Sequence, residues 1–228
     1  MLPRVEDENS IRRLAEILTL AGYTYIGLTV PTGLMRDRVR QLCRIFREQG
    51  IETAMRIDLT STNRAELLRF LRRFRSNYDI VSVKCLTPNV AIVACRDRRV
   101  DVIFFDLNNL KVRFNHSLAN LLHGAFELNL SSILTSAKEG LALLRTRKEL
   151  MLAREHGTRV VLSSGCASPL MIRSPAQLAS VASTLGLLPH QSCLGLTGVP
   201  SSIIERNMFR RSTEYVEEGV TIVLPRAG

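Results

Sequence analysis

Hydrophobic and polar positions along this chain repeat with two different periods. Short apolar runs rich in β-branched and aromatic residues, such as 25–30 and 80–85, are typical of buried strands. Between these runs, apolar residues recur every three or four positions, as in 36–49 and 62–75, which predicts amphipathic helices. The chain is therefore predicted to alternate strand and helix at least six times before residue 165.

The alternation changes after Pro169, where helices follow one another directly. We predict strands at 25–30, 51–59, 80–85, 100–105, 127–131 and 159–164. We predict helices at 10–21, 36–49, 62–75, 89–95, 117–126 and 138–156, then at 175–185, 189–196 and 201–211, with a final strand within 217–224.

This order of elements predicts a parallel sheet covered by helices, because parallel strands need crossover connections. A closed barrel and an open doubly wound sheet both satisfy it. No strand is followed by a glycine-rich dinucleotide loop, and about seven or more such units would close a ring. We therefore expect an α/β fold, a single TIM-barrel-like domain over residues 1–228 with extra C-terminal helices.

The charge of the chain indicates a polyanionic partner. Its net charge is +10, and only four lysines are present, so arginine supplies 27 of the 31 basic residues. A guanidinium group presents a rigid fork that matches phosphate oxygens, whereas lysine is a hydrated point charge. Nucleic acid is therefore the leading partner class, with genome base composition as the alternative source of the arginine bias.

Cysteine usage and hydropathy favour the cytoplasm. The five cysteines, Cys43, Cys85, Cys95, Cys166 and Cys193, are widely spaced and form no CxxC pair, which is typical of buried thiols in a reducing compartment. The acidic start MLPRVEDENS is unlike a signal peptide, and no apolar run reaches the roughly 18 residues of a membrane span. We expect a cytoplasmic protein without a membrane partner.

The carboxyl ends of the predicted strands are polar but hold no recognisable catalytic set, although barrel enzymes place their chemistry there. The four histidines form no HxH or HExxH motif, and no GxSxG, P-loop or GxGxxG motif is present. We therefore expect no catalytic residue, no metal site and no cofactor held by the protein.

Three segments resemble one family. The segment 160–178 contains VLSSGCASPLMIRSPAQL, in which a hydrophobic strand and a serine pair lead to Arg173 and Pro175 at a helix start. VDVIFFD at 100–106 and FNHSLANLL at 114–122 follow the same pattern as that family. Together they resemble ribonuclease P protein component 3, the archaeal and eukaryotic subunit, over roughly the last 130 residues.

The resemblance implies a protein subunit of a tRNA-processing ribonucleoprotein. In that complex the RNA cleaves the phosphodiester bond with magnesium, and the protein assists the 5′ maturation of precursor tRNA. The implied partners are the ribonuclease P RNA, other ribonuclease P proteins and, indirectly, precursor tRNA. The family's barrel is similar in shape to metal-dependent phosphoesterases but lacks their ligand set.

Seven residues are the candidate RNA ligands. We expect Lys111, Arg113, His116 and Arg173 to lie near one rim, and we add Lys84, Ser163 and Ser164 at strand ends. Backbone N–H groups of the loop SSGCASP, which begins at Ser163, could hold a phosphate, but we favour an ordinary turn for this segment. Arg173 pairing with Asp101 or Asp106, and His116 satisfied by backbone at a helix start, are the structural alternatives.

Two other functions stay open. One is a metal-dependent phosphoesterase with unrecognised ligands, and the other is a protein-only scaffold whose apolar tail and helix faces bind partner subunits. The arginines of 64–75 and the run Arg96, Arg98 and Arg99 are compatible with RNA contact, but we favour a solvated helix face for the first set and a loop for the second.

Overall fold

The computed structural model describes residues 8–136, 138–166, 169–217 and 220–221. Six strands form one parallel sheet in the order β1-β2-β3-β4-β5-β6. Their bounds are β1 (Tyr25–Thr29), β2 (Glu52–Ser61), β3 (Ile80–Cys85), β4 (Val102–Phe105), β5 (Ala125–Asn129) and β6 (Val160–Ser163).

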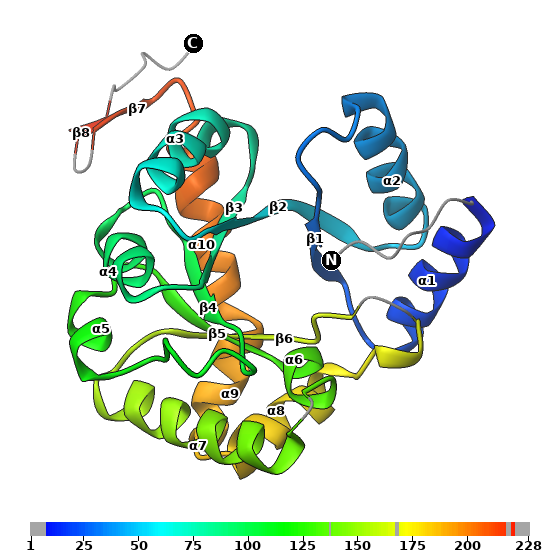
Figure 1. The fold of residues 1–228 in the computed structure, drawn as a ribbon. Helices are drawn as coiled ribbons and strands as arrows, with labels where there is room; N and C mark the ends of the chain where they lie inside the picture. Colours follow the sequence, from blue (N-terminus) through cyan, green and yellow to red (C-terminus); the bar gives the residue numbers. More distant parts are fainter. Residues whose placement is uncertain (1–7, 137, 167–168, 218–219, 222–228) are drawn as a thin grey trace.

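Helices connect and surround these strands (Figure 1). They are α1 (Glu8–Leu20), α2 (Arg36–Glu48), α3 (Arg64–Phe74), α4 (Pro88–Arg96), α5 (His116–Leu121), α6 (Leu130–Leu134), α7 (Glu139–Glu155), α8 (Pro175–Thr184), α9 (Pro189–Leu196) and α10 (Gly198–Phe209). Two short 3₁₀ turns, Arg75–Asn77 and Pro169–Met171, and an antiparallel pair, β7 (Tyr215–Glu217) and β8 (Val220–Thr221), complete the described elements.

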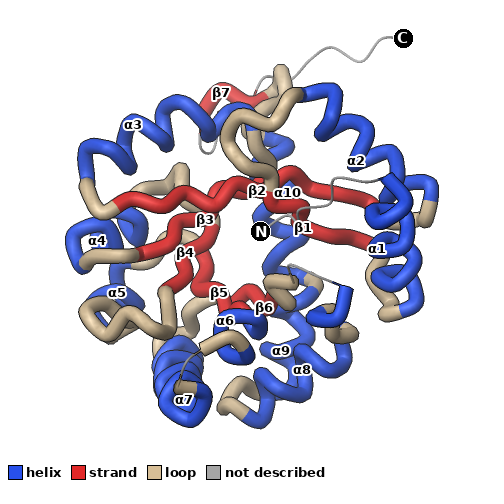
Figure 2. The backbone as a smooth tube through the Cα atoms, turned by 45° about the vertical axis from the view of Figure 1, so that its right-hand side comes forward, coloured by secondary structure: helices blue, strands red, loops and turns tan. Residues whose placement is uncertain are grey.

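The sheet curves into a half-barrel, with α10 on its inner side and most of the other helices outside it (Figure 2). This arrangement confirms the predicted α/β barrel-like fold. The expected ring of about seven or more units does not close through strand pairing, because in the described part of the chain β1 pairs only with β2 and β6 only with β5.

The outer face of the sheet packs against the helices to form the main core. Alternate residues of each strand, such as Ile57, Val83 and Ile103, point to this face and are almost completely buried. Helix residues of the same cluster, including Leu71 and Leu150, have no exposed surface. The predicted helix periodicity therefore marks the faces that cover the sheet.

α10 covers the concave face near the start of the strands. Its Ile203 and Ile204 are buried in one cluster with residues near the beginnings of five strands, namely Ala54, Ile80, Val102, Ala125 and Val161. Asn207 donates from Nδ2 to the carbonyl oxygen of Asp79 at 2.8 Å. Of the extra C-terminal helices predicted from the sequence, α10 thus fills part of the half-barrel itself, whereas Leu178 and Ala182 of α8 pack in the outer core.

The boundary between α5 and β5 differs from the prediction. A helix was expected over 117–126, but it ends at Leu121, and Ala125 is already in the strand. The amide of Ala125 donates to the carbonyl of Asp101 at 2.9 Å, and a Cβ at Gly124 would lie 2.6 Å from the same oxygen. Sheet hydrogen bonding thus overrides the helical periodicity of this segment. The predicted tail strand is partly confirmed by β7 and β8, while the rest of 217–224 lies outside the described residues.

Candidate functional site

The concave face of the sheet carries a buried ion pair above the α10 cluster. Arg56 of β2 donates from Nη1 and Nη2 to the two carboxylate oxygens of Glu127 on β5, at 2.9 and 2.6 Å. Its Nε donates to Asp58 at 2.7 Å, and its guanidinium carbon lies 5.8 Å from the centre of the Phe104 ring. Arg56, Asp58 and Glu127 thus fill the interior with paired charges. Because the Arg56 guanidinium already binds these two carboxylates, it is not available to bind RNA.

Burial alone would lower the pKa of Arg56, but the charges of Glu127 and Asp58 raise it above its ordinary value. The guanidinium therefore stays charged and cannot exchange a proton at neutral pH.

Lys84 lies at the carboxyl end of β3 and pairs with Asp106, which follows β4. The Lys84 Nζ is 2.8 Å from Asp106 Oδ2, and about one third of each side chain is exposed. Burial would raise the pKa of Asp106, but the hydrogen bond and charge of Lys84 lower it overall. The lysine predicted as an RNA ligand is thus already held by a carboxylate.

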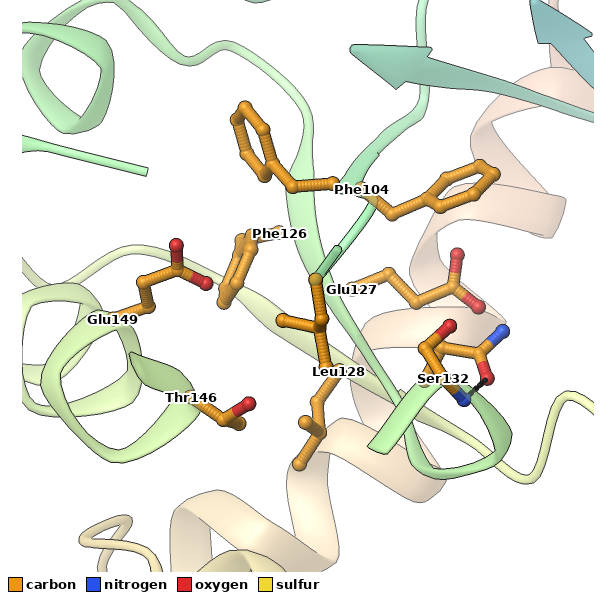
Figure 3. Close-up of a pocket in the computed structure, with 10 residues that line it drawn as sticks. Phe104, Phe126, Glu127, Leu128, Ser132, Thr146 and Glu149 are labelled. Atoms are coloured by element: carbon orange, nitrogen blue, oxygen red, sulfur yellow. Dashed lines mark hydrogen bonds between the residues drawn. The ribbon is translucent and has the colours of Figure 1, made fainter. Parts of the chain in front are cut away.

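A small cavity lies between β4, β5 and α7. Its volume is ≈ 20 Å³, and its lining includes Phe104, Phe126, Glu127 and Glu149. Figure 3 shows Glu149 on one side of β5 and Glu127 on the other. A volume of this size holds about one water molecule, so this cavity is too small for a nucleotide.

The SSGCASP loop is shaped by contact with the end of β5. Gly165 has a φ of +57°, and a Cβ there would lie 2.1 Å from Asn129 Oδ1. The same Asn129 oxygen caps α6 by accepting from the amide of Ser132 at 3.1 Å. Ser163 Oγ is buried and has no hydrogen-bond partner among the residues that the structure describes, and the carbonyl of Ser164 accepts from the Ser131 amide at 3.1 Å. Close packing against Asn129 and the positive φ therefore explain the glycine at position 165 without a bound phosphate.

Lys111 and Arg113 lie on the long segment between β4 and α5, and both side chains are exposed. Arg145 of α7 holds this segment by donating to four backbone carbonyls, with the shortest distance, 2.8 Å, to Asn109. Glu149 accepts from Arg145 Nε at 3.0 Å and from the Phe114 amide at 3.3 Å. The two exposed cations are thus presented on a firmly anchored backbone.

His116 and Arg173 lie apart from each other. His116 Nδ1 is 2.9 Å from Nε2 of His156, which ends α7 four residues before β6 begins. Arg173 follows β6 and donates to the carbonyls of Leu170 and Ile172 at 3.0 and 2.8 Å. Figure 1 shows α5 and the yellow segment before α8 on opposite sides of the molecule.

The expected single rim of Lys111, Arg113, His116 and Arg173 is therefore wrong. Arg145 and Glu149 bind the segment 106–115 along α7. The chain therefore runs beside this helix, and His116 lies near its C-terminal end, where it contacts His156. The alternative contacts fail as well. Asp101 pairs with Arg75 and Arg206, Asp106 pairs with Lys84, and the imidazole of His116 contacts another side chain rather than backbone.

Sequence reasoning missed the Arg56–Glu127 pair. Arg56 and Asp58 interrupt an otherwise apolar strand, and that interruption was the available signal. Among the described residues, no group of three or more histidine, cysteine or acidic side chains is placed to hold a metal ion. None of the helices in the described ranges is long and apolar enough to cross a membrane.

A family model described as RNase P subunit p30 matches residues 2–212. The chain belongs to this family. The match includes the first 75 residues, where the sequence motifs gave no support, and it confirms the resemblance inferred from segment 160–178. As a member of the p30 family, the chain is a protein subunit of RNase P.

Named relatives agree with this family. The ribonuclease P protein component 3 of Methanosarcina barkeri is 27% identical over 224 residues, covering 96% of this chain and 91% of the relative. The protein of the same name from Natronomonas pharaonis is 30% identical over 220 residues, covering 93% and 89%. In Arabidopsis thaliana, the protein GAMETOPHYTE DEFECTIVE 1 is 23% identical over 180 residues, which cover 77% of this chain and 30% of that protein.

The fold of the p30-family chain also has a close match of known structure. A chain in the cryo-EM structure of archaeal ribonuclease P with mature tRNA superposes with a TM-score of 0.84, covering 100% of this chain and 99% of that one. The two sequences are 18% identical. The barrel-like architecture is thus shared at low sequence similarity.

Proposed function

We propose that this p30-family subunit binds the ribonuclease P RNA and assists the 5′ maturation of precursor tRNA, while the RNA performs the cleavage. The family match over residues 2–212 is the observation that carries this proposal. The archaeal relatives are named as ribonuclease P components, and the structurally similar chain comes from a ribonuclease P complex with mature tRNA. Other ribonuclease P proteins are the expected protein partners.

The physical role follows from charge. Neutralisation of RNA phosphates by basic side chains releases counterions, and this term supplies affinity without reading bases. Of the seven candidate ligands, the exposed Lys111, Arg113 and His116 are the ones we assign to direct RNA contact. Arg173 remains a proposed contact on a separate surface, since its guanidinium also supports its own loop. Lys84, Ser163 and Ser164 we assign to shaping the carboxyl edge of the sheet.

The remaining features follow from this function. Magnesium serves the RNA rather than the protein, the chain acts as one domain over residues 1–228, and the complex works in the cytoplasm. The paired charges of Arg56 and Glu127 support a role without catalysis, because each of these two side chains is already held by the other across the concave face.

Reconstitution tests the proposal. Adding the full chain to cognate ribonuclease P RNA and its other protein subunits should restore cleavage of precursor tRNA at a magnesium concentration where the mixture lacking it is inactive. A basic protein of similar net charge serves as the control. No change in magnesium requirement would contradict the proposal, as would metal-dependent phosphodiester hydrolysis by the pure chain freed of nucleic acid.

A further inference from the structure

The edge of the sheet where the strands begin carries a concentration of arginine side chains that comes from four separate parts of the sequence. The contributing residues are Arg75 after α3, Arg99 before β4, Arg159 before β6, and Arg206, Arg210 and Arg211 at the end of α10. We call these six residues the amino-edge cluster. Barrel enzymes use the opposite edge for chemistry, so this side is free for another purpose.

Hydrogen bonds and ion pairs join most of the cluster into one surface. Asp101 is the centre, because its two carboxylate oxygens accept from Arg75 at 2.5 Å and from Arg206 at 2.6 Å. Arg75 also lies 3.4 Å from the carbonyl of Arg99, and Arg210 donates to the carbonyl of Arg98 at 3.3 Å. The end of α10 and the loop before β4 are therefore in direct contact.

The two ends of the cluster extend it along the edge. Arg211 pairs with Asp79 before β3. At the other side, Arg159 donates from Nη2 to the carbonyl of His123 at 2.8 Å. The surface thus spans the starts of β3, β4 and β6.

The carboxylates that contact the cluster do not balance its charge. Asp79, Asp97 and Asp101 pair with Arg211, Arg99, Arg75 and Arg206. Asp101, completely buried, serves two arginines at once. Arg159 and Arg210 donate to neutral carbonyl oxygens, so among the residues that the structure describes the six guanidinium groups contact three carboxylates.

Positive charges in the cluster also act on one another. Burial and then the charge of Arg206 lower the pKa of Arg159 from its ordinary value, although Asp101 opposes this effect. Arg159 is nevertheless an exposed residue, and Arg99, Arg206 and Arg211 keep about one third of their side-chain surface exposed. These arginines are therefore accessible from solvent, and a bound polyanion would relieve the repulsion between them.

We propose that the amino-edge cluster is a binding surface for the phosphodiester backbone of structured RNA. The proposal rests on the proposed function and deepens it by naming a surface distinct from the Lys111–Arg113 segment. Every cation in the cluster is an arginine, whose fork matches two phosphate oxygens, and its carboxylates already fix the forks in position. An acidic protein surface is the competing partner, but the chain's net charge of +10 favours the more densely charged RNA.

Binding of the full chain to ribonuclease P RNA at several salt concentrations tests the surface. The test variant is Arg159→Gln with Arg210→Gln, since these two arginines donate to neutral carbonyl oxygens. The matched control is Arg13→Gln with Arg44→Gln, which removes the same charge from exposed positions of α1 and α2. A third variant, Arg159→Lys with Arg210→Lys, keeps the charge, and thermal unfolding reports the fold of each.

The test variant should lose about tenfold or more in RNA affinity, and its plot of log K against log salt should be shallower by about one unit per lost phosphate contact. The control should bind within about twofold of the wild type, and the lysine variant should recover most of the salt slope, even if the glutamine variant is destabilised.

Three outcomes would overturn the proposal: equal losses in test and control variants, an unchanged salt slope in the test variant, or intact RNA affinity with lost binding to another protein subunit. In each case a wild-type chain that binds RNA and supports reconstitution leaves the proposed function standing. A wild-type chain that fails reconstitution removes the function itself.

Discussion

Arg56 and Glu127 connect β2 to β5 across the concave face of the half-barrel through two parallel hydrogen bonds of 2.9 and 2.6 Å. Glu127 exposes 1% of its side chain and Arg56 11%, so both charges have left water. The net stabilisation from such a pair is small, because desolvation of the two charges cancels much of their attraction. Removal of one partner is nevertheless costly, because it leaves the other charge buried and unpaired. The pair therefore fixes the position of β2 relative to β5 on the concave face, the region in which a barrel enzyme would bind its substrate.

Breaking this pair on one side should unfold the protein more easily. Glu127→Ala leaves a buried guanidinium with only Asp58, and we expect a loss of about 3–5 kcal/mol in the free energy of unfolding. Urea denaturation measures it. The double variant Arg56→Met with Glu127→Leu, which removes both charges at similar volume, should recover most of the loss. A loss below about 1 kcal/mol for Glu127→Ala would show that the pair is solvated in solution.

Stability should depend on the Lys84–Asp106 pair only above acidic pH. The pKa of Asp106 is lower in the folded chain than its ordinary value of 3.8, so its contribution is present above that value and is lost as pH falls through the folded pKa. Lys84→Met should therefore be less stable than the wild type at pH 6, and the difference should shrink below about pH 4. Urea unfolding from pH 6 to 2 measures this, with the exposed Lys138→Met as control. A difference that stays constant down to pH 2 would contradict it.

Gly165 should tolerate no side chain. Gly165→Ala strains a positive φ and places a methyl group within 2.5 Å of three Asn129 side-chain atoms, which also disturbs the cap of α6. We expect a loss of about 1–3 kcal/mol by chemical denaturation. Gly140→Ala is the matched control, because that glycine is helical and, apart from its chain neighbours and its own helix backbone, no described residue lies within 4 Å of the added Cβ. The control should gain up to about 1 kcal/mol.

The Lys111–Arg113 segment should contribute to RNA affinity through charge alone. Lys111→Gln with Arg113→Gln should weaken binding to ribonuclease P RNA and make the salt slope shallower by about one to two units. Both side chains are exposed, so the free energy of unfolding should change by less than about 0.5 kcal/mol. Arg13→Gln with Lys138→Gln removes the same charges elsewhere and should bind RNA like the wild type. Equal weakening in both variants would point to net charge rather than to this segment.

The elements of this fold were largely readable from local sequence. The prediction 80–85 coincides with β3, and 36–49 and 138–156 differ from α2 and α7 only at their ends. These segments carry their own periodicity and end signals, so short stretches suffice to define them. Two neighbouring segments were assigned wrongly: 117–126 was predicted as helix, although Ala125 is drawn into the sheet by its hydrogen bond to Asp101, and the strand predicted at 127–131 already gives way to α6 at Leu130.

The candidate site could not be predicted from the sequence, because its residues are far apart along the chain and meet only in the folded structure. The motifs around Ser163 and Arg173 indicated the family, yet they could not show that α5 and the segment before α8 lie on opposite sides of the molecule (Figure 1). Arg56 meets Glu127 71 residues later, and Arg206 meets Asp101 105 residues earlier.

The sequence alone thus determined the strand and helix order, the family resemblance and the excess of arginine, since these are properties of composition and local spacing. Only the tertiary structure decided that the sheet stops at a half-barrel, that α10 fills its concave side, and that six arginines gather where the strands begin. Ion pairs and charge clusters depend on sheet curvature and helix placement, and those arise from packing of the whole chain.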